Sequence, residues 1–152
     1  MKQSLTRVPF LLALACALAS ACGGSNGDTG PTETGQACRV AADCYPGVDV
    51  ASIQGEVSCL DRVPNGYCTH ACVTDSDCCA ATGECPFGYP EVCSPFESSG
   101  ETSCFLSCER ADLERAGLTD STVFCQKYAN ASFICRSSGG GSANRKVCVP
   151  DG

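Results

Sequence analysis

The sequence predicts a small disulfide-rich fold, made of three tandem cysteine units with short β-hairpins and one short helix. Three observations support this prediction. Sixteen of the 152 residues are cysteine, a level typical of disulfide scaffolds in exported chains. The gaps of five and then fourteen residues after Cys38 recur unchanged after Cys72. Tryptophan is absent, and there are only six Phe and four Tyr, so crosslinks must replace a large apolar core in offsetting chain entropy.

Residues 1–21 have the order of a secretory signal peptide. Lys2 and Arg7 precede an apolar run at residues 8–19, and small residues follow as far as Ala21. A run of twelve residues is too short to span a bilayer, which requires roughly 20. We therefore expect an exported protein whose signal is removed after Ala21.

Cys22 can be explained in two ways. The segment LASAC at residues 18–22 resembles a bacterial lipobox, in which the cysteine becomes a lipidated first residue, although the usual Leu position holds Ala19. Ordinary cleavage after Ala21 is the alternative and would give a secreted protein. Cys16 leaves with the signal, and the fourteen cysteines that follow Cys22 can form seven pairs. Cys22 would then be an odd thiol left over from this pairing, and lipidation would use it. We expect a lipid-anchored protein of the cell envelope, and Gly23 in place of Asp favours the outer membrane, facing the periplasm or the exterior.

The rest of the chain divides by composition and cysteine spacing. Residues 22–37 comprise Cys22 and a linker rich in Gly, Thr, Ser and Asp, predicted to be a flexible tether. Unit one spans 38–70, unit two 71–106 and unit three 107–150.

Each unit ends in a predicted hairpin. In unit one, β-compatible segments at 56–60 and 67–69 flank the turn signal Pro64-Asn65-Gly66. In unit two the corresponding segments are 91–93 and 102–104, with a turn at 98–100. In unit three they are 133–135 and 146–149, with a Gly/Ser turn at 137–142.

Unit three also carries an insert between its first two cysteines. Residues 109–116 are rich in good helix formers. Ser107 is the expected N-cap, Gly117 the expected C′ residue and Leu118 its apolar contact. We expect one short helix here and little helix elsewhere.

The cysteines predicted to form disulfides divide four, six and four among the units. The simplest account of the two extra cysteines in unit two is a local bridge, Cys79–Cys85. Within each remaining four, many pairings are possible, and we favour first to third and second to fourth. The fourteen are Cys38, Cys44, Cys59, Cys68, Cys72, Cys78, Cys79, Cys85, Cys93, Cys104, Cys108, Cys125, Cys135 and Cys148.

The net charge argues against some partners. It is −7 for the whole chain, and it becomes −9 when Lys2 and Arg7 leave with the signal, because eight basic residues then face 17 acidic ones. A negative surface disfavours nucleic acid and anionic lipid. The membrane, through the lipid anchor, and an extracellular protein or glycan are the partners that we expect.

No catalytic, cofactor or metal site is predicted. Paired C-x2-C spacing, the strong zinc motif, is absent. His70, the only histidine, has no nucleophile motif beside it and is expected to be a surface linker residue. Asp75, Asp77 and Glu84 do not follow the calcium-loop pattern, so we interpret this segment as a capped turn.

Four aromatic residues lie in Pro/Gly-rich loops. They suit recognition, because rigid aromatic side chains contribute contact area with little loss of entropy, but such rings also pack on disulfides in small folds. Packing is the favoured interpretation, and recognition stays open. The four are Tyr45, Phe87, Tyr89 and Phe96.

The segment Cys72-x-x-Asp75-x-Asp77-Cys78 resembles the opening of extracellular cysteine-rich modules of the Dickkopf N-terminal type. The lipobox, the glycine-rich tether and the C-x5-C units together resemble cysteine-rich lipoproteins of myxobacteria and related Gram-negative bacteria. This resemblance, over roughly residues 18–108, implies an anchored, non-enzymatic binding or envelope-structural module. A protease inhibitor that presents the loop Pro95–Ser98 is the alternative function.

Overall fold

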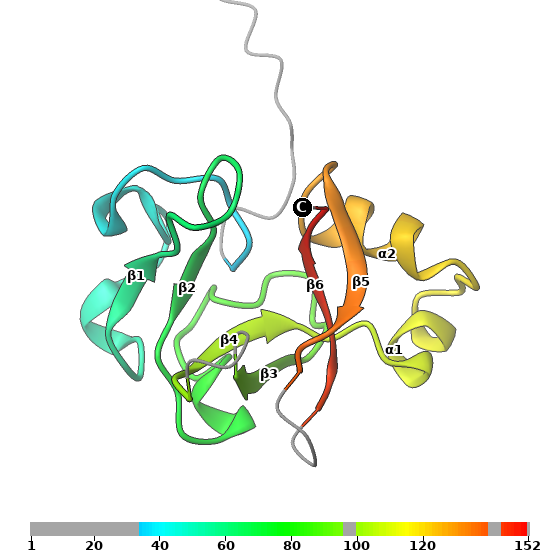
Figure 1. Cartoon of the computed structure of the whole chain (residues 1–152). Coiled ribbons are helices and arrows are strands. Elements are labelled where there is room, and N and C mark those ends of the chain that lie inside the picture. Colours follow the sequence, from blue (N-terminus) through cyan, green and yellow to red (C-terminus); the bar gives the residue numbers. More distant parts are fainter. Residues whose placement is uncertain (1–33, 96–99, 140–143, 152) are drawn as a thin grey trace, which may run out of the picture.

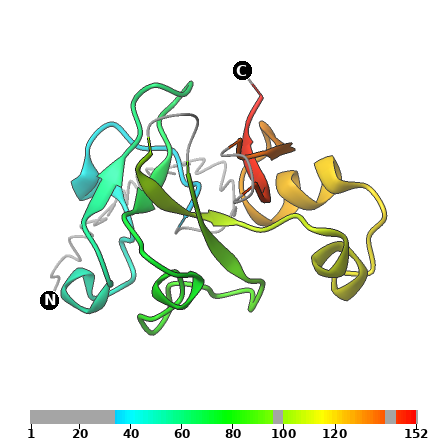
Figure 2. The same ribbon diagram turned by 60° about the horizontal axis from the view of Figure 1, so that its bottom comes forward.

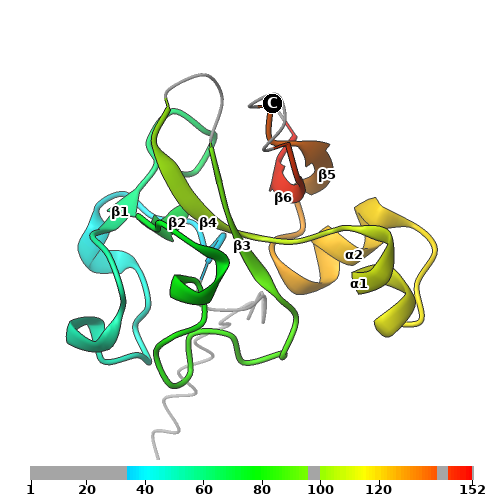
Figure 3. The ribbon, with the colours of Figure 1, turned by 90° about the horizontal axis from the view of Figure 1, so that it is seen from below.

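The computed structural model describes residues 34–95, 100–139 and 144–151. The expected signal peptide, Cys22 and the tether as far as residue 33 lie outside the described residues. Within these described ranges, six strands form three separate antiparallel pairs, and the β3–β4 hairpin lies between the other two (Figures 1, 2 and 3). The strands are β1 (Val57–Cys59), β2 (Cys68–His70), β3 (Glu91–Pro95), β4 (Thr102–Leu106), β5 (Phe133–Ser137) and β6 (Lys146–Pro150).

The three predicted hairpins are confirmed, and their registers are equivalent. In each hairpin the last two cysteines of the unit stand opposite each other, as Cys59 does with Cys68. The equivalent pairs are Cys93 with Cys104 and Cys135 with Cys148. In unit one the turn places Asn65 at φ 67° and Gly66 at φ 73°, the positive-φ combination that tight hairpin turns favour.

The facing cysteines do not bond to each other; each bonds to an earlier cysteine of its own unit. The favoured order, first to third and second to fourth, holds in all three units, and the extra bridge Cys79–Cys85 is present. Two staggered links therefore hold each hairpin to the segment that precedes it. The other pairs are Cys38–Cys59, Cys44–Cys68, Cys72–Cys93, Cys78–Cys104, Cys108–Cys135 and Cys125–Cys148.

Units one and two open with the same short turn. The 3₁₀ segments η1 (Ala41–Asp43) and η3 (Asp75–Asp77) each end just before the second cysteine of their unit. A further one, η2 (Val50–Ser52), lies between the second and third cysteines of unit one. Asp43 Oδ2 accepts hydrogen bonds from the backbone N–H groups three and four residues earlier, at 3.1 and 2.8 Å. Asp77 Oδ2 does the same, at 2.8 Å for both. An aspartate before the second cysteine thus fixes the opening turn.

Unit three differs from the sequence prediction in its helices. The expected helix is present as α1 (Arg110–Arg115), and Gly117 follows it at φ 68°. The N-cap is Glu109, so the prediction of Ser107 was wrong. The Ser107 hydroxyl instead donates to Asp112 Oδ2 at 2.6 Å. A second helix, α2 (Ser121–Tyr128), was not expected and places the second cysteine of the unit.

The three units share one apolar cluster. Tyr67 of unit one stacks on Phe133 of unit three, with ring centroids 5.3 Å apart, and contacts Phe105 of unit two at the same distance. The Tyr67 hydroxyl donates to the Cys148 carbonyl at 3.2 Å. The largest cluster of buried residues draws its members from all three units, and strand β4 contacts both β2 and β6. The units are therefore tandem in sequence but packed as one body.

The last residues of the expected tether are part of this body. Gly35 N–H donates to the Cys68 carbonyl, and Cys68 N–H donates to the Gln36 carbonyl, each at 2.8 Å. Thr34 is 3% exposed, and its hydroxyl donates to Glu91 Oε2 at 2.6 Å. The prediction of a flexible tether is therefore wrong for residues 34–36, because Gly35 and Gln36 form backbone hydrogen bonds alongside β2 and Thr34 is buried.

Candidate functional site

Three aromatic side chains form a partly exposed surface, here called the aromatic face: Phe87, Tyr89 and Tyr128. Phe87 and Tyr89 lie in the loop that follows the Cys79–Cys85 bridge, and Tyr128 is the last residue of α2. The Tyr128 ring centroid lies 4.5 Å from that of Tyr89 and 5.8 Å from that of Phe87. Phe87 is 51% exposed. The segment that follows a disulfide-closed loop and the end of a helix thus bring three rings together at the surface.

Hydrogen bonding couples the two phenols of the aromatic face. The hydrogen bond between them raises the pKa of Tyr89 and lowers the pKa of Tyr128. The Lys127 amine, 5.0 Å from the Tyr128 ring centroid, lowers the pKa of Tyr128 further. The face therefore offers both ring surfaces and polar edges.

A small cavity lies beneath the aromatic face. Its volume is about 20 Å³, and its wall includes Thr34, Glu91 and Leu106. A space of that size holds about one water molecule. Ligand contact at this site would therefore be made on the outer surfaces of the rings and not inside the cavity.

A larger open groove of about 680 Å³ lies between unit one and the start of unit two. Residues from both sides of the junction line it, and one of them, Val73, is 88% exposed. Gly55 packs against the Ala71 carbonyl so closely that an added Cβ would lie 1.9 Å from that oxygen. The groove is lined by Gln54, Gly55, Ala71, Cys72, Val73, Thr74 and Asp77.

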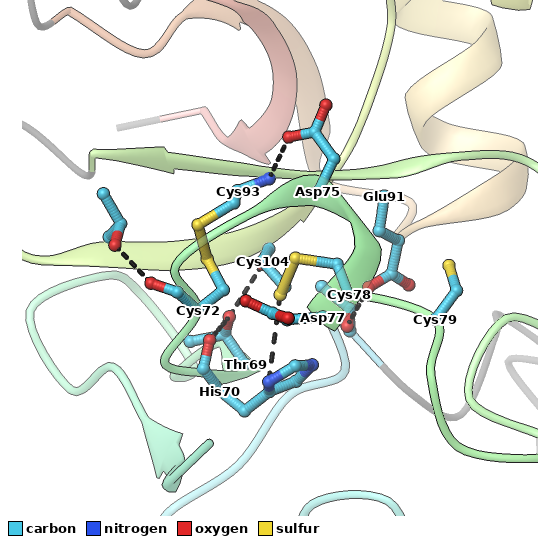
Figure 4. The surroundings of a disulfide bond; sticks show 12 residues. Thr69, His70, Cys72, Asp75, Asp77, Cys78, Cys79, Glu91, Cys93 and Cys104 are labelled. Carbon is cyan, nitrogen blue, oxygen red and sulfur yellow. Dashed lines mark hydrogen bonds between the residues drawn. A yellow bond between two sulfur atoms is a disulfide. The ribbon is translucent and has the colours of Figure 1, made fainter. Parts of the chain in front are cut away.

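His70, next to this groove, is buried, so its prediction as a surface linker residue was wrong. Its side chain and that of Glu84 are both 0% exposed, and Nε2 lies 2.6 Å from Glu84 Oε1. Figure 4 shows His70 beside the Cys78–Cys104 bridge, where Nδ1 lies 3.8 Å from Cys104 Sγ. Burial alone would lower the pKa of His70, but the hydrogen bond and the charge of Glu84 outweigh it and raise the pKa.

The carboxylates considered for calcium point to separate partners. Asp77 caps η3, and its pKa is lowered by the backbone N–H groups of Thr74 and Val73. Asp75 accepts from Cys93 N–H at 2.9 Å and forms an ion pair with Arg145 at 3.0 Å. Glu84 is committed to His70 and to Ala81 N–H. The segment is a capped turn, as the sequence indicates.

Of the two remaining loop aromatics, Tyr45 lies in the core, and Phe96 lies outside the described residues. Tyr45 is buried, and its hydroxyl is 2.8 Å from the Thr34 hydroxyl. Phe96, with the rest of the loop at 96–99, lies outside the described residues. Packing, the favoured interpretation, thus holds for Tyr45, while Phe87 and Tyr89 join a surface cluster.

Potential metal ligands coincide with the disulfides. Four groups of three donor residues bring their ligand atoms within 4.8 Å of one another in the described part of the chain. Each group contains at least two cysteines that are disulfide-bonded. A thiolate, and not a disulfide sulfur, is the ligand that metals take from cysteine, so these groups are structural crosslinks.

Two features of the site escaped sequence reasoning. Tyr128 was missed because α2 was missed, although Asp120 is a favourable N-cap residue and Phe124 and Tyr128 have helical spacing. The His70–Glu84 pair was missed because fourteen residues separate its members. The local bridge Cys79–Cys85, which was predicted, is the one signal that the segment carrying Glu84 folds back.

Comparison with family models, with curated proteins and with solved structures finds no match to this chain. Its class therefore follows from the structure itself, which is a small disulfide-rich fold with seven bridges. So many disulfides indicate an extracellular or cell-envelope location, where the compartment is oxidising. In the part of the chain that the structure describes, no helix has the length and apolar character needed to cross a membrane.

Proposed function

We propose that the chain is an exported, membrane-anchored, non-enzymatic module that binds a partner or has a structural role in the cell envelope. One observation carries the anchoring proposal. All fourteen cysteines from Cys38 to Cys148 are described, and the seven bridges use every one of them. Once Cys16 leaves with the signal, Cys22 is the one cysteine left over from this pairing. A leftover thiol in an oxidising compartment is reactive, and lipidation would consume it.

The aromatic face supports the binding role. Its rings sit on the segment between the Cys79–Cys85 bridge and β3, and on the capped helix α2, so little conformational entropy is lost when a partner covers them. The chain's negative charge disfavours nucleic acid. An extracellular protein or a glycan is the class of partner that such a surface suits.

Intact mass of protein extracted from its native membranes tests the anchor. The expected mass includes lipid on Cys22 and rises by about 14 Da on reduction, roughly 2 Da for each of seven bridges. The Cys22→Ser variant is expected to lose the lipid and leave the membrane fraction. An unmodified chain beginning at residue 22, found in the medium, would instead establish simple secretion.

A matched pair of variants tests the aromatic face. Phe87→Ala and Val123→Ala each remove an exposed apolar side chain, 51% and 45% exposed, but only the first belongs to the face. On a glycan array and an envelope-protein panel, Phe87→Ala is expected to weaken binding roughly tenfold, the effect of removing one aromatic anchor, and Val123→Ala to leave it unchanged. Equal binding by both variants would remove the aromatic face from the proposal.

The protease-inhibitor alternative is tested separately. Its loop begins at Pro95, the last residue of β3, and continues into residues outside the described part. We expect no inhibition of a serine-protease panel at micromolar concentrations of the exported portion. Stoichiometric inhibition of any member would replace the proposed function with this alternative.

A further inference from the structure

The buried His70–Glu84 pair joins the two sides of the unit one–unit two junction. His70 ends β2 of unit one. Glu84 lies in the loop that the Cys79–Cys85 bridge closes in unit two. Their side chains are 0% exposed, and His70 Nε2 lies 2.6 Å from Glu84 Oε1. The extra disulfide of unit two therefore closes the loop that carries a carboxyl group to the only imidazole of the chain.

The surrounding acceptors fix the number of protons on the pair. His70 Nδ1 lies 3.1 Å from the Gln54 carbonyl oxygen and 3.0 Å from that of Ala71. Carbonyl oxygens only accept, so Nδ1 must carry a proton. A second proton must lie between Nε2 and Oε1, because otherwise two lone pairs would face each other in a buried site. An imidazolium with a carboxylate and a neutral imidazole with a carboxylic acid both satisfy this count.

At mildly alkaline pH, His70 and Glu84 together therefore hold one more proton in the folded chain than in the unfolded chain. In the unfolded chain, the ordinary histidine pKa of about 6.5 leaves the ring neutral and the carboxyl ionised at pH 8. Folding above that pKa therefore takes up one proton. Two further titratable groups of the described residues face the ring. The charge of the Asp77 carboxylate interacts with His70, and the Tyr45 ring meets the imidazole edge-on, with the ring centroids 5.8 Å apart. Cys104 is disulfide-bonded and does not titrate.

We propose that the shared proton of His70 and Glu84 is a pH-sensitive latch that holds the Gln54–Gly55 wall of the groove against Ala71 and releases it as the pH rises. The Gln54 and Ala71 carbonyls bound by Nδ1 belong to residues that line the groove. Gly55 packs on the same Ala71 oxygen. Loss of the shared proton leaves Nε2 and the carboxylate facing each other without a hydrogen bond, so the ring and both carbonyls lose their fixed positions.

The direction of the pH effect follows from proton linkage. The folded state binds more protons than the unfolded state above the unfolded histidine pKa, so its stability is complete below that pKa and declines as pH rises. One proton of difference changes the unfolding equilibrium constant by up to tenfold for each pH unit. The decline ends where the folded pair itself loses the proton.

Glu84→Gln is the decisive variant, because glutamine satisfies the same bonds without the extra proton. Its carbonyl oxygen can accept from Ala81 N–H, as Glu84 Oε2 does at 2.8 Å, and its NH₂ group can donate to a neutral Nε2. The stability of the variant is then expected to be flat above pH 7 and to fall in acid, where Nε2 becomes a donor facing another donor. The wild type is expected to show the opposite slope. Glu114→Gln, on the exposed side of α1, is the charge-matched control and should follow the wild type.

Denaturant unfolding with the disulfides intact, between pH 5 and pH 9.5, measures these slopes. Parallel slopes for wild type and Glu84→Gln would overturn the latch. If the variant does not fold, nitrogen-15 resonances of the wild-type imidazole decide the question. We expect the shared proton to leave above the ordinary histidine range, with the Gln54 and Gly55 amide resonances moving at the same midpoint. A midpoint within the ordinary range, or stationary Gln54 and Gly55 resonances, would contradict the proposal.

Discussion

Individual residues set the geometry at the points where backbone segments meet. Gly55, at φ 120°, lets unit one approach the Ala71 carbonyl more closely than any side chain would allow. Asp43 and Asp77 each tie down a turn with one carboxylate oxygen. The close approach at Gly55 and the turns held by the two aspartates are both made by backbone atoms. Neither therefore requires a large apolar side chain.

Replacing Gly55 by alanine is expected to destabilise the protein by about 3 kcal/mol, the range for strain at a special backbone position combined with a steric clash. The added Cβ would lie 1.9 Å from the Ala71 oxygen, an atom that cannot move alone. Gly88→Ala is the control, because Gly88 also has a positive φ, 67°, but has nothing within 4 Å of an added Cβ. Denaturant unfolding with intact disulfides compares them, and equal losses would show that φ alone decides the cost.

Asp77 is expected to make the protein sensitive to acid. Backbone hydrogen bonds from Thr74 and Val73 lower the pKa of Asp77 below 3.8. The stabilisation is therefore present above the unfolded pKa and is lost as pH falls through the lowered folded pKa. Melting temperatures from pH 5 to pH 2 should fall less steeply for Asp77→Asn, from a lower starting value, than for the wild type. The exposed substitution Asp61→Asn should leave the profile unchanged, and a wild-type slope in Asp77→Asn would contradict the assignment.

At the scale of elements, the hairpins were predicted from the sequence, whereas α2, whose sequence signals are weaker, was missed. The hairpins were visible because each combines a turn signal with two cysteines, and Asn65-Gly66 has the backbone angles that its sequence indicates. Helix α2 contains Thr122, Val123 and Phe124, whose helix propensity is low. Tertiary contacts decide its conformation, through Phe124, which is 0% exposed, and the Cys125–Cys148 bridge.

The candidate site was less predictable than the fold, because its members come together only in three dimensions. Phe87 and Tyr89 were identified as loop aromatics, but their partner Tyr128 comes from the unpredicted helix. His70 gave no local sign of burial, since its acidic partner Glu84 lies beyond three further cysteines. Cysteine spacing predicts the crosslinks within a unit. The aromatic face and the His70–Glu84 pair, in contrast, are formed by residues from different units.

The N-cap of α2 offers a test of how a helix supports the aromatic face. Asp120 accepts hydrogen bonds from the N–H groups of Thr122 and Val123. Asp120→Ala is expected to cost about 1 kcal/mol, the typical loss of a capping side chain. Asp120→Ser, which restores a capping oxygen, should recover most of it in the same denaturant series. A loss that Ser does not recover would indicate that the charge of Asp120, and not its hydrogen bonds, stabilises the helix.

At the scale of the whole molecule, three units that share the same pair of staggered bridges surround one apolar cluster. Contacts between units are specific: Tyr67 reaches the Cys148 carbonyl, and the Thr69 hydroxyl donates to the Cys104 carbonyl at 2.7 Å. These bonds satisfy polar groups in the interior. Unit two is central because β4 contacts the hairpins on both sides. We therefore expect one cooperative unfolding transition and not three.

The order in which the bridges are reduced should follow their exposure. Thiol–disulfide exchange requires access to a sulfur; Cys79 is exposed, whereas Cys78 and Cys104 are 0% exposed. In limiting reductant we expect Cys79 and Cys85 to be alkylated first, while the near-ultraviolet circular dichroism of the buried aromatics persists.

Complete reduction is expected to unfold the protein, because each bridge in a small exported domain contributes typically about 2–4 kcal/mol. The shared cluster is too small to replace seven such contributions against chain entropy. Mass spectrometry of alkylated peptides, taken alongside the dichroism, separates the two stages. Early alkylation of Cys78 and Cys104 would contradict the exposure argument. A native spectrum and protease resistance after full reduction would show that apolar packing, and not the disulfides, holds the fold.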